Sequence, residues 1–154
     1  MLAVLGVMFA IGFQVLPRDR ITVNQAAERF ERDLQRARFN AISFNTQISF
    51  ELDHEANVYR AVPANVLSAQ RAGFVVDLAR EGLAGVEINA ANSGSWSGTI
   101  PCDFGDSDPD NPAAWRFDAR GVGRQDGVTL VTFEHARTGY ELSLCVNSYG
   151  RVMR

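Results

Sequence analysis

The chain has 154 residues, of which 46% are hydrophobic and 21% are charged, and its formal net charge is −3 at pH 7. This length fits one domain with a short appendage, and the composition excludes a disordered or low-complexity protein. The slightly acidic balance also excludes a protein whose whole surface binds polyanions.

The chain begins with an apolar run. Met1 to Leu16 contain no charged residue, and three charged residues follow Pro17. A secretory signal would carry basic residues before such a run and a small-x-small cleavage site after it, and neither is present. A complete transmembrane helix needs about 20 apolar residues. We therefore expect residues 1–16 to be the lower half of a membrane helix whose first turn or two is missing. A degenerate, cleaved export signal is the alternative.

Residues 17–45 are predicted to continue this helix as an amphipathic one, with a bend near Pro17. Apolar residues recur at alternating steps of four and three, which places them on one helical face. The residues on this face are Val23, Ala27, Phe30, Leu34, Ala37 and Ala41. The other side is charged and includes the i,i+4 pairs Glu28–Arg32 and Arg29–Asp33. We expect the apolar stripe to be buried against the rest of the chain.

Residues 46–154 are predicted to form a mostly antiparallel β-body. Alternating polar and apolar residues indicate strands in 47–53 and 57–62, joined as a hairpin, and further strands in 73–79 and 85–89. Later candidates are 99–104, 114–119, 128–135 and 140–147, with a short closing strand in 150–154. A long helix followed by such a body predicts an α+β fold in one domain.

The sequence offers no catalytic motif, so we expect no enzymatic activity and no cofactor. His54 and His135 have no metal-ligand partners at suitable spacing, and we expect both to be ordinary surface residues in turns. Acidic residues at alternate positions in the loop 103–112 resemble the start of a calcium loop. The glycine and glutamate that such a loop requires are absent there, so a solvated acidic turn is the favoured interpretation.

Cys102 and Cys145 fit neither a metal site nor a redox dyad. They are either buried thiols or, if the body lies outside the cytoplasm, a disulfide.

Arginines gather near the end of the sequence. Arg151 and Arg154 follow Tyr149, and Arg116, Arg120, Arg124 and Arg137 are expected in neighbouring strand ends or loops. Such a cluster suits a nucleic-acid backbone, whereas a solvated sheet edge is the simpler interpretation.

The apolar helix half, the proline and the amphipathic QAAERFERDLQRARFNAI resemble a type IV pilin-like protein. The later WRFDARGVG and the terminal VNSYGRVMR resemble the minor pseudopilin and minor pilin family that contains GspH, FimT and FimU. The resemblance covers nearly the whole chain. Members of this family begin with a basic leader, and a glutamate follows the site where the leader is cleaved. Neither is present here, so we expect the start of the sequence to be truncated.

The resemblance implies a membrane-anchored subunit with a periplasmic domain from residue 17 to residue 154. Its helix sits in the bacterial inner membrane and, after N-terminal processing and methylation, packs against other pilin subunits in a filament. We therefore expect a structural subunit of a type II secretion pseudopilus or type IV pilus, near the tip, that aids assembly or contacts secreted cargo. The disulfide Cys102–Cys145 fits the periplasmic location. The alternative is a DNA-binding minor pilin for natural transformation that uses Arg120, Arg124, Arg151 and Arg154.

Overall fold

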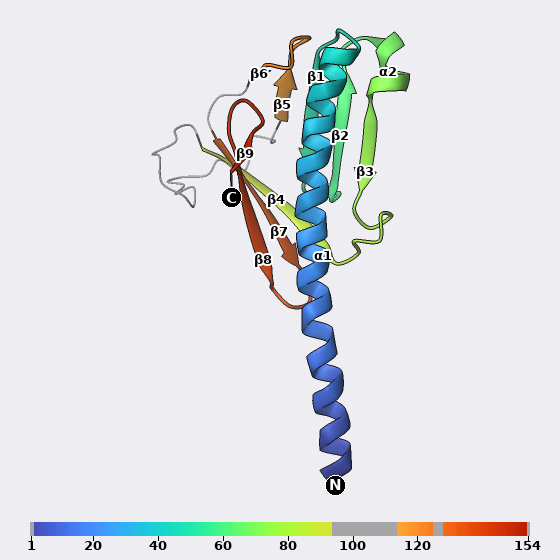
Figure 1. The fold of residues 1–154 in the computed structure, drawn as a ribbon, viewed down its shortest axis with the longest axis vertical. Helices are drawn as coiled ribbons and strands as arrows, with labels where there is room; N and C mark the ends of the chain where they lie inside the picture. Colours follow the sequence, from blue (N-terminus) through green and yellow to red (C-terminus); the bar gives the residue numbers. More distant parts are fainter. Residues whose placement is uncertain (1, 94–113, 125–127, 154) are drawn as a thin grey trace.

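The fold was obtained as a computed structural model that describes residues 2–93, 114–124 and 128–153, with only the backbone described for residues 2–17, 66, 68–69, 91–93 and 124. Helix α1 (Leu2–Ser43) leads into a head built from two antiparallel sheets and a short helix. Figure 1 shows α1 extending far beyond the head, with the amino terminus at its free end. The predicted α+β class is confirmed.

Among the described residues, the first sheet has five strands in the order β3-β2-β1-β5-β6. Its strands are β1 (Ile48–Asp53), β2 (Val58–Pro63), β3 (Phe74–Asp77), β5 (Ala114–Phe117) and β6 (Gly123–Arg124). The predicted hairpin joins β1 and β2, and Asn57 adopts a positive φ of 53° in its turn. Helix α2 (Val66–Ala72), which the sequence did not predict, connects β2 to β3.

In the part of the chain that the structure describes, the second sheet has four strands in the order β4-β7-β8-β9. Its strands are β4 (Val86–Ser93), β7 (Val128–His135), β8 (Glu141–Val146) and β9 (Val152–Met153). One row across this sheet places three glutamates directly opposite one another, Glu87 on β4, Glu134 on β7 and Glu141 on β8. Like charges in such cross-strand pairs repel, so this row weakens the sheet.

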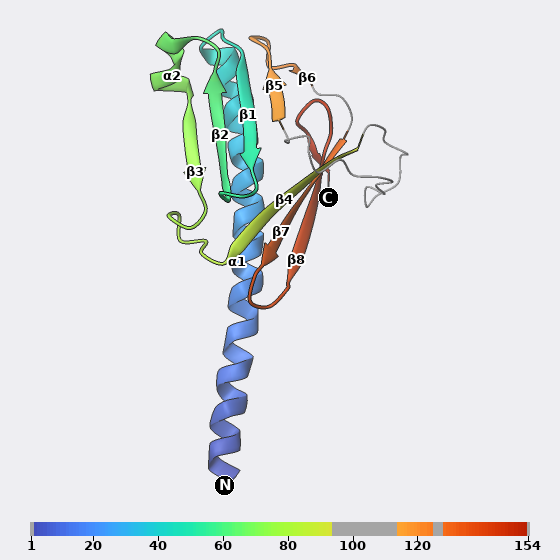
Figure 2. The ribbon, with the colours of Figure 1, turned by 180° about the vertical axis from the view of Figure 1, so that it is seen from behind.

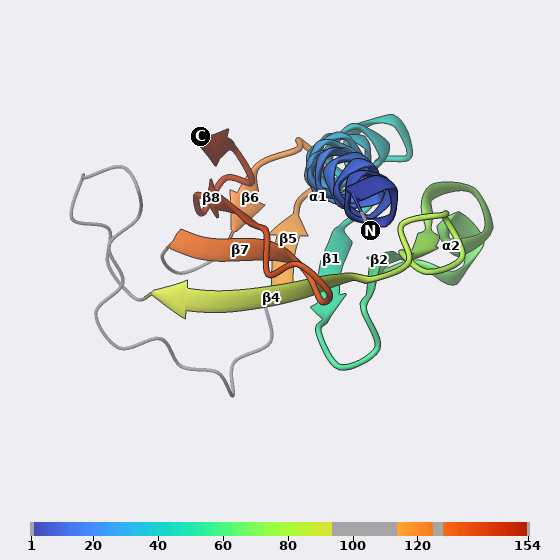
Figure 3. The same ribbon diagram turned by 90° about the horizontal axis from the view of Figure 1, so that it is seen from below.

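Helix α1 contacts strands of both sheets, which lie on one side of it, as the views from behind and from below show (Figures 2 and 3). All six residues of the predicted apolar stripe, from Val23 to Ala41, have no exposed surface. Phe30 lies at the centre of the core. Its ring makes edge contacts with Phe50, Tyr59 and Trp115 of the first sheet and with Phe133 of the second.

A buried polar contact also fixes α1. The Tyr59 hydroxyl donates a 2.8 Å hydrogen bond to Oδ2 of Asp33, which lies on α1. Burial, followed by the charge of Asp33 and this hydrogen bond, raises the pKa of Tyr59 well above its ordinary value. Arg29 lies 3.6 Å from the same carboxylate and 2.9 Å from Glu81, so it ties α1 to the segment before β4.

The end of α1 has a local cause. The helix stops at Ser43, two residues before the predicted boundary, and continues through Pro17 without interruption. Asn45 adopts a left-handed φ of 47° just beyond the end, and the backbone N–H of Thr46 donates to the carbonyl of Ala41. This is the usual termination of a helix by a residue that tolerates left-handed geometry.

Candidate functional site

The outward face of α1 carries a second regular stripe, opposite the buried one. Its residues are exposed and also recur at steps of four and three: Ile21, Gln25, Glu28, Arg32, Gln35, Phe39 and Ile42. Gln35 and Ile42 lie at the edge of this stripe where it meets the head. Phe39 is 67% exposed and Ile21 is 54% exposed, so the stripe combines large apolar side chains with polar ones. This outward stripe has the spacing that a neighbouring helix needs for packing along α1.

The lower half of α1 stands free of the head in Figures 1 and 2. The side chains of residues 1–17 lie outside the described part of the chain, so the membrane segment predicted for 1–16 stays a prediction. Within the part that the structure describes, no helix is long and apolar enough to cross a membrane.

The motifs that carried the family resemblance form a packed joint beside α1. Gly150 adopts a φ of 72°, and a Cβ there would lie only 2.7 Å from the ring of Phe117. Gly121 adopts a φ of 73°, and a Cβ there would meet the side chain of Ile42 at 2.6 Å. Both positions therefore favour glycine for two reasons, the left-handed backbone and the lack of space.

The carboxy-terminal turn completes this joint. A Cβ on Gly123 of β6 would lie 2.7 Å from the backbone of Tyr149. Gln35 of α1 donates a 3.4 Å hydrogen bond to the carbonyl of Gly150, and Asn147 accepts the backbone N–H of Arg151 at 2.9 Å. The WRFDARGVG segment, through Phe117 and Gly121, and the terminal Gly150–Arg151 thus hold the last strand, β6 and α1 together.

Asp118 organises the turn between β5 and β6. Its Oδ1 accepts the backbone N–H of Val122 at 3.0 Å and that of Arg120 at 2.9 Å. The pKa of Asp118 lies below its ordinary value because Val122 and then Arg120 donate to the carboxylate. The Arg120 guanidinium also binds Asp118 at 3.0 Å, so this predicted nucleic-acid contact already has an acidic partner.

The other predicted arginines do not form one described cluster. Arg151 is exposed beside Tyr149, which is 61% exposed. The side chain of Arg124 and the whole of Arg154 lie outside the described residues. Arg137 does not belong to this group, because it lies in the turn between β7 and β8 and binds Asp19 of α1.

The structure also bears on the predictions for the histidines and cysteines. His54 is exposed in the β1–β2 turn as expected, but His135 is buried, with 8% of its surface exposed, because the β7–β8 turn packs against α1. Cys145 is buried in β8, no described cysteine is free, and its predicted partner Cys102 lies outside the described residues. The disulfide therefore stays a prediction.

Metal binding is not supported within the described ranges. No group of three or more histidine, cysteine, aspartate or glutamate side chains there is placed to hold a metal ion. The acidic loop 103–112, the calcium alternative, lies outside those ranges.

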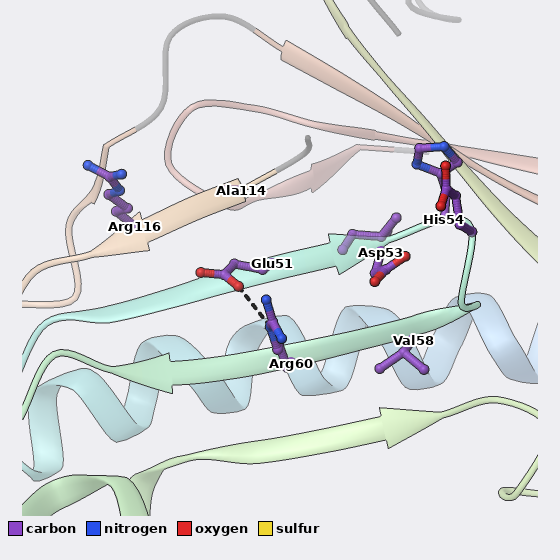
Figure 4. A pocket seen from close by; sticks show the side chains of 9 residues that line it. Glu51, Asp53, His54, Val58, Arg60, Ala114 and Arg116 are labelled. Atoms are coloured by element: carbon purple, nitrogen blue, oxygen red, sulfur yellow. Dashed lines mark hydrogen bonds and ion pairs between the residues drawn. The ribbon is translucent and has the colours of Figure 1, made fainter. Parts of the chain in front are cut away.

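A pocket of about 440 Å³ opens on the outer face of the five-stranded sheet. Figure 4 shows its lining, in which Arg60 binds Glu51 at 2.8 Å. The other charged or titratable lining residues are Asp53, His54, Glu55 and Arg116. The mixed charges of this lining suit contact with a polar partner segment.

A family model described as type II transport protein GspH matches residues 26–150. The match spans most of the amphipathic part of α1, the first sheet, the second sheet except β9, and the terminal turn up to Gly150. Comparisons with curated proteins and with solved structures returned no match.

Proposed function

Because the chain belongs to the GspH family of type II transport proteins, we propose that it is a minor pseudopilin near the tip of a type II secretion pseudopilus. The family is one of structural pseudopilins rather than enzymes, and its members interact with other pseudopilins. The observation that carries the proposal is the division of α1. One stripe is fully buried by the head. The residues of the outward stripe are exposed, although Gln35 and Ile42 also touch the head, and the lower half of the helix projects free of it.

Before assembly, the apolar residues 1–16 anchor the subunit in the inner membrane and the head lies in the periplasm. On assembly, the helix exchanges lipid contacts for contacts with neighbouring helices. Lipid tails and neighbouring helices are both apolar, so such association is driven by close packing and interhelical contacts. The outward stripe extends this packing surface along the head, with apolar residues at both of its ends and polar residues between them.

The head supplies a rigid surface for the tip. Its aromatic core joins α1 to both sheets, so contacts made by the head are transmitted to the helix. The pocket on the outer face of the five-stranded sheet points away from α1, which leaves it accessible to secreted cargo or to another tip subunit while α1 packs in the filament.

The first test is a secretion assay in the source cells. Deleting the gene is expected to abolish export of type II substrates, and the intact gene is expected to restore it. Phe39→Arg on the outward stripe should fail to restore export, because it introduces a charge into the helix packing surface. The matched control is Val75→Arg on β3, where the side chain is equally exposed at 67%. Normal export in the deletion strain refutes the proposal.

The mature amino terminus provides a second test. Mass spectrometry of the native protein is expected to find a mature amino terminus that retains the apolar run of residues 1–16 and carries an N-methyl group. A terminus near Pro17 or beyond would identify the apolar run as a discarded export signal and contradict the assembly model.

DNA binding by a minor pilin is the second candidate. It is favoured by exposed Arg151 beside exposed Tyr149, a combination that suits phosphate contact and base stacking. If it is correct, affinity for DNA falls steeply with salt, and Arg151→Ala combined with Arg154→Ala abolishes binding. A lack of DNA binding at low salt removes this candidate.

A further inference from the structure

A buried ionic contact ties α1 to the β7–β8 turn. Asp19 of α1 has only 8% of its side chain exposed, and Nη2 of Arg137 donates to both of its carboxylate oxygens, at 2.9 and 2.8 Å. Nε2 of His135 lies 3.5 Å from Oδ1 of the same carboxylate. Asp19 precedes His135 and Arg137 by more than 110 residues in the sequence.

Asp19 lies on the face of α1 that packs against the head, one turn before buried Val23. A carboxylate in such a position is costly unless cationic or hydrogen-bonding partners satisfy it. Arg137 supplies that partner and is itself 60% exposed, so the rest of its guanidinium stays hydrated. Burial of Asp19 therefore depends on the position of Arg137 in the β7–β8 turn.

The turn itself is held rigidly. The backbone N–H of Ala136 donates to the carbonyl of Gly85 at 2.8 Å, and that of Gly139 donates to the carbonyl of His135 at 2.8 Å. The backbone N–H of Arg137 donates to Nδ1 of His135 at 3.3 Å, which fixes the ring so that Nε2 faces Asp19.

A cation–π contact joins the same two elements. The guanidinium of Arg20 on α1 lies 5.1 Å from the ring centroid of Tyr140, the residue before β8. Figures 1 and 2 show that the β7–β8 turn is the last part of the head beside α1 before the helix projects freely. Consecutive residues of α1 are thus fixed at the point where the helix leaves the head.

We propose that Asp19, His135 and Arg137 form a stem latch that sets the direction in which the lower half of α1 leaves the head. When the latch is closed, head and helix move as one body. When it is open, the β7–β8 turn separates from α1 and the head tilts about the last buried turns of the helix. Resting on the proposed function, this inference makes the latch the element that aligns the head of a subunit with its helix in the pseudopilus.

The test uses the full chain in detergent micelles. Arg137→Ala is expected to speed amide hydrogen exchange about tenfold in residues 18–23 and 135–140, which corresponds to the loss of one charged hydrogen-bonded contact. Exchange in the β1–β2 hairpin should stay unchanged. The matched control is Arg80→Ala, which removes an exposed arginine that pairs with Asp77 only three residues away. Unchanged exchange near Asp19, or equal acceleration throughout the head, overturns the latch.

The angle between α1 and the head can be measured separately from local stability. Spin labels are placed by unnatural amino acids at Gln14 on the lower half of α1 and at Val75 on β3. The distribution of distances between them should broaden in Arg137→Ala and in Arg137→Lys, which keeps the charge but lacks the planar guanidinium. An unchanged distribution in both variants overturns the proposal.

Secretion separates this inference from the proposed function. If deleting the gene abolishes export and Arg137→Ala lowers it at normal protein levels, the latch acts in assembly. If deletion leaves export intact, the proposed function fails, whereas the exchange and distance measurements still decide the latch.

Discussion

Replacing Phe30 by alanine removes the ring at which α1 and both sheets meet. Phe30 has no exposed surface and makes four edge contacts with other aromatic rings, at centroid distances of 5.4 to 6.0 Å. Truncating a buried phenylalanine costs about 3–5 kcal/mol, and aromatic pairs add to the lost burial. We expect a loss of about 4 kcal/mol, a large fraction of the stability of an ordinary domain.

Urea unfolding of the full chain in detergent, followed by the fluorescence of buried Trp115, measures this loss. With a slope of about 2 kcal/mol per molar urea, the midpoint should fall by about 2 M. Phe39→Ala on the same helix is the control, because that side chain is 67% exposed and its loss should shift the midpoint little. Equal shifts for the two variants would refute the assignment of Phe30 to the core.

Three further predictions follow from local contacts. The raised pKa of Tyr59 means that the folded protein holds the phenol proton more tightly than the unfolded chain does. The protonated phenol therefore contributes its full stability below about pH 10, and this contribution is lost as the pH rises further. Urea unfolding at pH 8 and pH 11 should show a smaller alkaline loss for Tyr59→Phe than for the native chain, which contains no lysine. Gly150→Ala should lower the free energy of unfolding by about 1–3 kcal/mol, because alanine strains the left-handed backbone and meets the ring of Phe117; an unchanged melting temperature contradicts this. Glu134→Gln should raise stability by about 0.2–1 kcal/mol at low salt, because Glu134 is the middle carboxylate of the glutamate row, and the gain should shrink in salt.

The periodicity of the sequence identified the helix face because a helix places residues three and four apart on one side. Every residue of the predicted stripe from Val23 to Ala41 is buried. Alternation likewise located the hairpin of β1 and β2 and the strands β7 and β8. Helix α2 and the two-residue β6 were missed because elements this short carry no usable period.

The family motifs were visible in the sequence, but their physical role was not. Gly121 and Gly150 are required by close contacts with Ile42 and Phe117, which lie far away along the chain. The same motifs suggested an arginine cluster, and only the structure showed that Arg120 is paired with Asp118.

The amphipathic helix, most of the strands and the family can be predicted from the sequence, because these depend on local pattern. The division of the strands into two sheets and the contacts between distant side chains become visible only in the folded chain. Asp19 and Arg137 appear in the sequence as ordinary surface charges, and His135 as a turn residue. They come together because the β7–β8 turn folds back against the first head-contacting turn of α1, a long-range contact that no local pattern encodes.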